Sequence, residues 1–156
     1  MAKHRRDALP QGEFDEIFAK VPRLTVEVIV LSPRGVLLAQ RDSGPCKGLW
    51  SIPGGTVRYG ESLTDATRRV ALDEIGTSVD VGQLLGYLEY PSHLAQGIDW
   101  PIGIAFKCHL SSGSSQTGLA ESASWQWFQE LPLQMHEEQR SFLMETELDD
   151  VVLTSR

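Results

Sequence analysis

The chain has 156 residues, of which 41% are hydrophobic, and a formal net charge of -7 at pH 7. This length and composition suffice for one domain with its own core. The negative charge argues against binding along a nucleic-acid backbone, which requires clustered lysine and arginine. The basic start of the chain is not followed by an apolar stretch, so we expect no secretory signal, no membrane span and no membrane partner.

The chain contains two cysteines, Cys46 and Cys108, which match no disulfide framework and no metal-ligand spacing. A reducing cytoplasm is therefore the expected compartment. We predict a disordered arm over residues 1–12, a single domain over 13–150 and a short tail over 151–156.

The first elements in chain order are a short amphipathic helix and a hairpin. The helix is indicated by apolar residues at helical spacing, namely Phe14, Ile17, Phe18 and Val21. Residues 24–31 and 36–39 are apolar runs separated by a proline and glycine turn, and they predict two antiparallel strands.

A loop followed by a helix is predicted next, over the segment GGTVRYGESLTDATRRVALDEIG at residues 54–76. Ser62 is a suitable N-cap and Gly76 a suitable residue to end the helix, which would span about residues 63–75. Val70, Asp73 and Glu74 would share one stripe of this helix, and we expect that stripe to face a ligand.

The carboxylates of Asp73 and Glu74 would repel each other at the negative end of the helix dipole. A bound cation would relieve this repulsion, and oxygen ligands suit Mg²⁺. Arg69 lies four residues before Asp73, where it could brace the carboxylates or contact a phosphate oxygen. Taken alone, the pair is better explained as a solvated helix face with ordinary charge pairs.

The later elements are strands at about 84–90, 102–110 and 124–128 and a final helix at 135–147. Phe142 and Leu143 should pack inward from this helix, whereas Glu137 and Glu138 are interpreted as solvated charges. Residues 91–101 read as a loop, and residues 111–118 as a flexible connection.

The ordered pattern in residues 54–76 resembles the signature box of the Nudix hydrolases. The matching positions are Gly55, Glu61, Arg69, Glu74 and Gly76. The preceding segment RDSGPCKGLWSIPGG is similar to the approach to that box in members that act on sugar nucleotides and nucleoside triphosphates.

Two departures from the box affect its chemistry. Asp73 is one carbon shorter than the expected glutamate. Val70 stands where most family members have a glutamate that helps bind a further metal or acts as base. The helix therefore supplies only part of a metal site.

The resemblance implies an α/β fold, specifically the Nudix α/β/α sandwich with a mixed β-sheet. It also implies Mg²⁺, with Mn²⁺ as a substitute, and a small-molecule nucleotide substrate. The expected reaction is cleavage of the pyrophosphate of a nucleoside diphosphate linked to another moiety, either a nucleotide sugar or a nucleoside triphosphate, by water attack at phosphorus. The oligomeric state is left open, and a homodimer is one candidate.

The same resemblance assigns the metal ligands and the catalytic groups. The ligands are the backbone carbonyl of Gly54 and the carboxylates of Asp73, Glu74 and Glu121. Glu121 is the preferred base, and Arg69 joins Glu74 and Glu121 as a catalytic residue.

Substrate contacts are expected from residues outside the box. By resemblance, Arg41 would contact the diphosphate and Glu27 a sugar hydroxyl. Tyr90 and Trp100 flank the loop at 91–101 and would either stack on a nucleobase or serve as core and edge aromatics. His93, in the same loop, is either a solvated histidine or a replacement base.

Two alternatives remain open. The box also resembles that of GDP-mannose mannosyl hydrolases, which lack the same glutamate and direct water to the sugar C1. Those enzymes use a glutamine followed by a histidine where this chain has Glu121 and Ser122, and an arginine where it has Thr56. The second alternative is a binding or regulatory module that has lost catalysis, which Val70 and the shortened Asp73 motivate.

Overall fold

The computed structural model describes residues 8–112, 124–148 and 151–155. Its helices are α1 (Gln11–Phe18), α2 (Leu63–Ile75), α3 (Pro91–Ala95) and α4 (Glu137–Glu145). Its strands are β1 (Arg23–Ser32), β2 (Gly35–Gln40), β3 (Trp50–Ser51), β4 (Gly54–Thr56), β5 (Val79–Glu89), β6 (Pro101–Leu110), β7 (Trp125–Phe128), β8 (Glu130–Leu131) and β9 (Thr154–Ser155).

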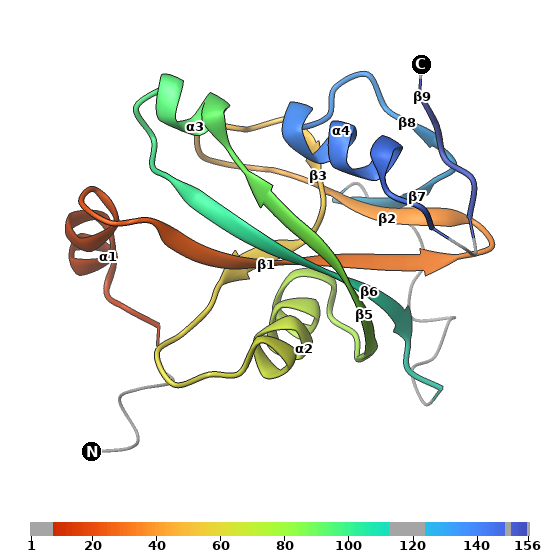
Figure 1. Ribbon diagram of the computed structural model, residues 1–156, viewed down its shortest axis with the longest axis horizontal. Helices are drawn as coiled ribbons and strands as arrows, with labels where there is room; N and C mark the ends of the chain where they lie inside the picture. Colours follow the sequence, from red (N-terminus) through yellow and green to blue (C-terminus); the bar gives the residue numbers. More distant parts are fainter. Residues whose placement is uncertain (1–7, 113–123, 149–150, 156) are drawn as a thin grey trace.

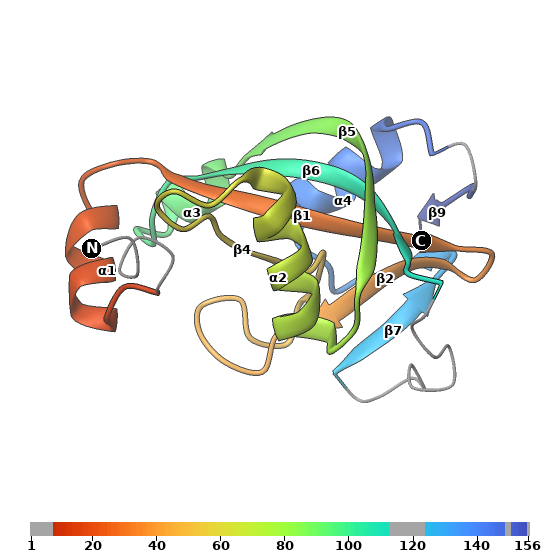
Figure 2. The same ribbon diagram turned by 90° about the horizontal axis from the view of Figure 1, so that it is seen from below.

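A mixed sheet forms the middle layer of the molecule. β1 pairs antiparallel with β2 and β4 and parallel with β6, while β5 is antiparallel to β6. β3 and β7 both pair with β2. α2 covers one face of this sheet and α4 lies on the other (Figure 1), and the view from below places α2 in front of the strands (Figure 2). The predicted α/β/α sandwich is confirmed.

Strand β1 is buried on both faces, which explains its run of β-branched residues. Because successive side chains point to opposite faces, Val26, Val28 and Val30 join the core beneath α2. Ile29 and Leu31 join the core on the α4 side. A glutamate within such a strand must therefore lie inside the protein or line a cavity.

The predicted hairpin between β1 and β2 is present, with Ser32 paired to Gly35 across a two-residue turn. Gly35 has φ +113°, which other residues rarely adopt. A Cβ at this position would also collide with the backbone of Phe128 on β7. Glycine is thus required here by conformation and by packing.

Helix α2 has the predicted bounds and caps. The Ser62 hydroxyl accepts a hydrogen bond from the Asp65 backbone N–H at 3.0 Å, and Gly76 has φ +69°. Val70 does not share a ligand-facing stripe with the carboxylates, because it is buried in the α2 core. Its Cγ2 lies 2.9 Å from where a Cβ on Gly55 would stand. The box glycine therefore lets β4 approach this valine closely.

Several elements differ from the sequence predictions. α1 ends at Phe18, and Val21 is 47% exposed instead of facing the core. The region expected to be a loop contains α3. Residues 151–155 are not a free tail, because Val151 and Leu153 pack against the core and β9 pairs with β8. None of the helices in the described ranges has the length and apolar character needed to cross a bilayer.

Candidate active site

A pocket of about 90 Å³ opens where the beginning of β1 meets β4, the loop at 41–49, α3 and the beginning of α4. Most of its lining residues have polar side chains, and they come from segments far apart in the sequence. The polar side chains in the lining are Arg23, Thr25, Glu27, Arg41, Cys46, Ser51, Tyr90, His93, His136 and Gln139. Three of the predicted substrate-binding residues, Glu27, Arg41 and Tyr90, thus line one cavity.

A chain of buried hydrogen bonds orients Glu27. The Tyr90 hydroxyl donates to Glu27 Oε1 at 2.6 Å. Gln139 Nε2 donates to the Tyr90 oxygen at 3.0 Å, and Gln139 Oε1 accepts from the Ile52 backbone N–H at 2.7 Å. The Thr25 hydroxyl adds a contact of 3.3 Å to Glu27 Oε1. The carboxyl is thereby held in a fixed position by β1, by α4 and by the residues that directly follow β3 and β5.

The environment of Glu27 disfavours its ionised form. The side chain is 4% exposed, and burial raises its pKa from 4.5 to about 7, although the Tyr90 hydrogen bond and the charges of Arg23 and Arg41 act in the opposite direction. A Cβ at Gly54 would come within 2.6 Å of Glu27 Oε2, and one at Gly103 would collide with Oε1. Two glycines therefore make room for a carboxyl that titrates near neutral pH.

Glu74 lies at the exposed end of α2, and it is the carboxylate of the predicted pair that has no ion pair to Arg69. Partial burial raises its pKa, and Asp73 and Asp42 add to the effect while Arg41 opposes it. Arg41 lines the pocket and also acts on Glu27, so its positive charge influences both the pocket and the end of α2.

The backbone carbonyl of Gly54 is oriented away from β1. Flanking hydrogen bonds run from Val57 N–H to Leu24 O and from Val28 N–H to Pro53 O. In an antiparallel ladder the bonded positions alternate, so Gly54, opposite Glu27, is a position without ladder bonds to β1. Its carbonyl is therefore not used in the ladder with β1, and its predicted role as an oxygen ligand stays a prediction.

Arg69 forms a structural clamp, and its predicted catalytic role stays a prediction. Its Nε and Nη2 donate to the two carboxylate oxygens of Glu61 at 2.7 and 2.9 Å, and Nη2 also donates to the Thr56 carbonyl at 2.9 Å. Nη1 lies 3.5 Å from Asp73 Oδ2. The hydrogen bonds from Arg69 lower the pKa of Glu61. The guanidinium therefore links the loop before α2 to the helix. It also forms an ion pair with Asp73.

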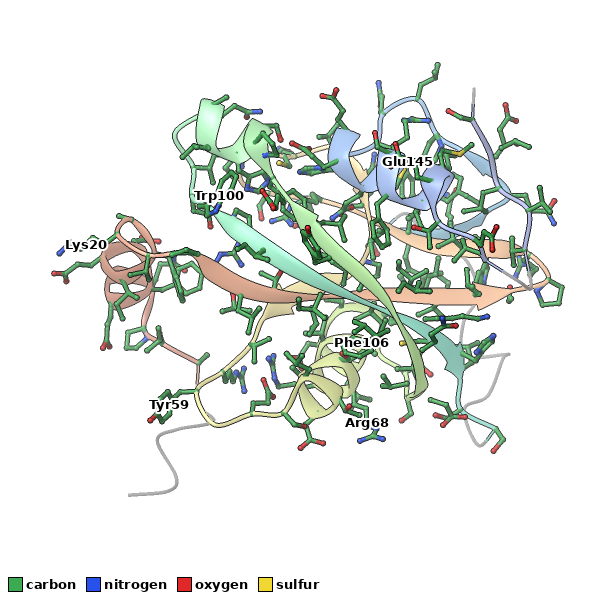
Figure 3. The ribbon with its side chains drawn as sticks, in the orientation of Figure 1. Lys20, Tyr59, Arg68, Trp100, Phe106 and Glu145 are labelled. Carbon is green, nitrogen blue, oxygen red and sulfur yellow. The ribbon has the colours of Figure 1, made fainter. Side chains whose placement is uncertain are left out.

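Replacing Arg69 by alanine should lower the free energy of unfolding by about 2–3 kcal/mol, because the bidentate pair with the nearly buried Glu61 is lost. The neighbouring Arg68 supplies a matched control. Its side chain is 56% exposed, points away from α2 (Figure 3) and lies 3.5 Å from the exposed Asp65. Arg68→Ala should cost less than about 0.5 kcal/mol. Equal losses in urea denaturation would contradict the clamp.

The two aromatic residues predicted to bind substrate lie in different places. Tyr90 is buried, with its ring against His93 and His136, so it has no open face for a nucleobase and instead positions Glu27. Trp100 lies immediately before β6, between α1 and α3 (Figure 3). It lines a separate hollow with Phe18.

His93, expected as either a solvated histidine or a replacement base, and Glu138, expected to be solvated, both have polar partners. His93 is a pocket residue on α3 whose Nδ1 lies 3.1 Å from Asp99. Glu138 accepts a hydrogen bond from the Ser92 backbone N–H at 2.8 Å and lies 3.2 Å from His136. Burial lowers the pKa of His136, with Glu138 opposing the shift. The predicted third metal ligand and base, Glu121, lies outside the described residues, as do residues 113–118 of the predicted flexible connection.

Sequence reasoning missed Gln139, His136 and Cys46. No local motif surrounds Gln139 or His136, and the spacing of Cys46 from His93 and His136 matches no ligand pattern. The one available signal was the residue type. Glutamine, histidine and cysteine that border apolar segments are candidates for burial with a hydrogen-bond partner.

Comparisons with known proteins place this geometry in a family. A family model of the NUDIX domain matches residues 21–145. The low-salt glycan biosynthesis protein Agl8 of Haloferax volcanii is 41% identical over 93 residues, which cover 58% of this chain and 60% of that protein. An ADP-ribose pyrophosphatase of Methanocaldococcus jannaschii is 31% identical over 97 residues, covering 62% of this chain and 56% of that protein. The matched region thus spans less than two thirds of either relative.

Solved structures agree with the fold. A MutT NUDIX hydrolase from Burkholderia pseudomallei superposes with a TM-score of 0.65 at 23% identity, over 80% of this chain and 97% of that one. A UDP-X diphosphatase gives a TM-score of 0.61 at 21% identity, over 88% of this chain and 70% of that one. The sheet, the box helix and the matched family model together show that this chain belongs to the NUDIX family.

Proposed function

We propose that this chain is a Mg²⁺-dependent hydrolase that cleaves the pyrophosphate of a nucleoside diphosphate linked to another moiety. The observation that carries the proposal is the meeting of Arg41, Glu27 and Gly54 in one pocket, with Arg41 acting electrostatically on Glu74 at the end of the box helix. This arrangement offers a cation for phosphate and a carboxyl for a hydroxyl group. It also supports the Gly54 carbonyl and the Glu74 carboxylate as the oxygen ligands that we propose for a metal.

The residues present fit Mg²⁺ by their chemistry. Glu74 is near the negative charges of Asp73 and Asp42, and a cation would offset their repulsion. The Gly54 carbonyl and the Glu74 carboxylate would hold the ion, together with Glu121 by its place in the family pattern. Asp73 faces Arg69 and would act from further away. When bound, Mg²⁺ neutralises charge that develops on the phosphate oxygens.

The protein residues would divide the remaining work. Arg41 pairs with a diphosphate oxygen and orients the phosphorus. Glu121 accepts a proton from a water molecule, whose oxygen attacks that phosphorus. The bond from phosphorus to the bridging oxygen breaks, and this oxygen leaves with the second phosphate. Glu27 holds a hydroxyl of the attached group in the pocket.

A nucleotide sugar is the substrate class that we favour. Glu27 is a fixed, buried carboxyl with a hydrogen-bonding environment suited to a sugar hydroxyl. The similarity to a protein named for glycan biosynthesis supports the same choice over a nucleoside triphosphate.

Hydrolysis at the sugar carbon is the second candidate. It is favoured by the depth of Glu27 and by the two histidines that share its pocket, since either a carboxyl or an imidazole can serve as base. In that reaction the water oxygen would bond to C1 and the nucleoside diphosphate would leave intact.

A panel of nucleotide sugars and nucleoside triphosphates in ¹⁸O-labelled water, with Mg²⁺, tests the proposal. We expect turnover of at least one nucleotide sugar, with the label in a phosphate product identified by mass spectrometry. Label in the sugar would replace the first mechanism with the second. Thermal stabilisation by these compounds without any product would contradict hydrolysis and indicate a binding module.

A further inference from the structure

A cysteine and two histidines from separate segments converge at the pocket. His93 Nε2 lies 3.1 Å from His136 Nε2 and 3.9 Å from Cys46 Sγ. These three atoms all lie within 4.8 Å of one another. Within residues 8–112, 124–148 and 151–155, this is the group of histidine, cysteine and acidic side chains close enough to share an ion.

Two carboxylates flank the histidine pair on its outer sides. Asp99 Oδ1 lies 3.1 Å from His93 Nδ1, and Glu138 Oε2 lies 3.2 Å from His136 Nδ1. The four side chains thus form a row with three close contacts. These contacts are carboxylate to imidazole, imidazole to imidazole, and imidazole to carboxylate. Each contact needs a proton or a cation between its two atoms.

Two neutral imidazoles supply only two protons for these three contacts. If both Nδ1–H groups face the carboxylates, both Nε2 lone pairs face each other at 3.1 Å. If an Nε2–H fills the central gap, one carboxylate contact is left without a proton. The structure carries a sign of this conflict, because His136 Nδ1 and Glu138 Oε2 are buried and their close contact has poor hydrogen-bond geometry.

A metal ion in the central gap satisfies every contact. Both Nε2 lone pairs would then coordinate, and both Nδ1–H groups would donate to carboxylates, as metal-bound histidines usually do. A thiolate and two imidazoles suit Zn²⁺, in contrast to the oxygen ligands near Glu74. In a tetrahedral zinc site the two nitrogens lie about 3.3 Å apart and a sulfur about 3.6 Å from each nitrogen.

The observed separations approach these values. The nitrogen pair already matches, and Cys46 Sγ, which lies within 4.8 Å of both nitrogens, would need to move by roughly 1 Å. Cys46 belongs to the loop between β2 and β3, where such an adjustment involves no strand pairing. Cys46 and His136 are 9% and 6% exposed, so water is largely excluded from their outer sides.

We propose that Cys46, His93 and His136 bind one Zn²⁺ ion, whose fourth coordination position faces the pocket that contains Glu27. All three side chains line that pocket together with Glu27 and Tyr90. Binding releases the Cys46 thiol proton, so the site gains a net positive charge. The fourth position accepts water or an oxygen of a bound phosphate or hydroxyl compound. The ion also ties the loop at 41–49 and α3 to the beginning of α4.

The test is Zn²⁺ binding to the full chain, with any affinity tag removed and with excess Mg²⁺ present to occupy the carboxylate site. Calorimetric titration at pH 8 should give one Zn²⁺ per chain with a Kd below about 1 µM. Cys46→Ala and His93→Gln should each weaken binding by at least about 100-fold. Cys108→Ala and His109→Gln, which alter the same residue types elsewhere, should leave it unchanged.

X-ray absorption on the unmodified zinc protein provides a readout that does not depend on how variants fold. It should show one sulfur at about 2.3 Å and two nitrogens at about 2.0 Å. Absence of binding at pH 8, or an all-oxygen shell, would overturn the proposal, and a hydrogen-bonded histidine pair would then explain the cluster. Equal affinity of Cys46→Ala would overturn it as well. Because none of these measurements uses turnover, they remain informative if the hydrolase proposal fails.

Discussion

Glu74→Gln is expected to lower kcat by about 100-fold or more with the best substrate of the panel. Glutamine keeps the side-chain volume and removes the charge, so packing at the end of α2 should be preserved. Val70 is buried and apolar, and Asp73 contacts Arg69, so neither can replace the lost carboxylate. The apparent affinity for Mg²⁺ should fall in parallel, and steady-state rates over a Mg²⁺ titration measure both effects.

The control for this substitution is Glu137→Gln. Glu137 is an exposed glutamate in the first turn of α4, and it is absent from the pocket that contains Glu27. Its replacement should leave kcat within about twofold, because no proposed ligand or substrate contact is altered. Unchanged kcat in Glu74→Gln at saturating Mg²⁺ would remove Glu74 from the proposed metal site.

Glu27→Gln is expected to change how stability depends on pH. The pKa of Glu27 is raised in the folded protein to about 7, from 4.5. Between these values the folded state binds more protons than the unfolded state, so the free energy of unfolding falls as pH rises through this window. The full cost, on the order of 3 kcal/mol, is present above pH 7 and absent below pH 4.5.

Glutamine carries no charge at any pH, and its amide oxygen can still accept the Tyr90 hydrogen bond. The stability of Glu27→Gln relative to the unmodified protein should therefore increase from pH 4.5 to pH 8. Urea denaturation across this range measures the difference and cancels the titration of other groups. Glu89→Gln, an exposed glutamate on β5, should show a flat difference. A flat difference for Glu27→Gln too would mean that its carboxyl is not desolvated.

The elements predicted well from sequence are those fixed by local chemistry. Ser62 and Gly76 define the ends of α2 because capping involves residues three or four positions apart. The alternation of β1 and the tight turn before Gly35 are likewise local signals. Helical periodicity could not separate the core face from the ligand face at Val70, since adjacent stripes of a helix overlap.

The pocket was predicted only in part, because its polar contacts join distant residues. Glu27 and Arg41 were identified by family pattern, yet the partners that hold Glu27 were not. Glu138 was interpreted as solvated because an adjacent glutamate pair normally is, whereas the position of α3 brings Ser92 against it. Tertiary structure determines such hydrogen-bond partners, and the spacing of residues along the sequence does not indicate them.

The hydrogen-bond chain through Glu27 has a consequence for how the molecule acquires its pocket. Its links join residues 63, 49 and 87 positions apart, and β1 also pairs in parallel with β6 through partners such as Val26 and Ile104. Contacts of this separation bear a large loop-closure entropy and form late compared with local turns and helices. The α2 caps can exist in a partly folded chain, but the pocket has no local precursor. The pocket is complete only when nearly all of the strands and helices have taken their final positions.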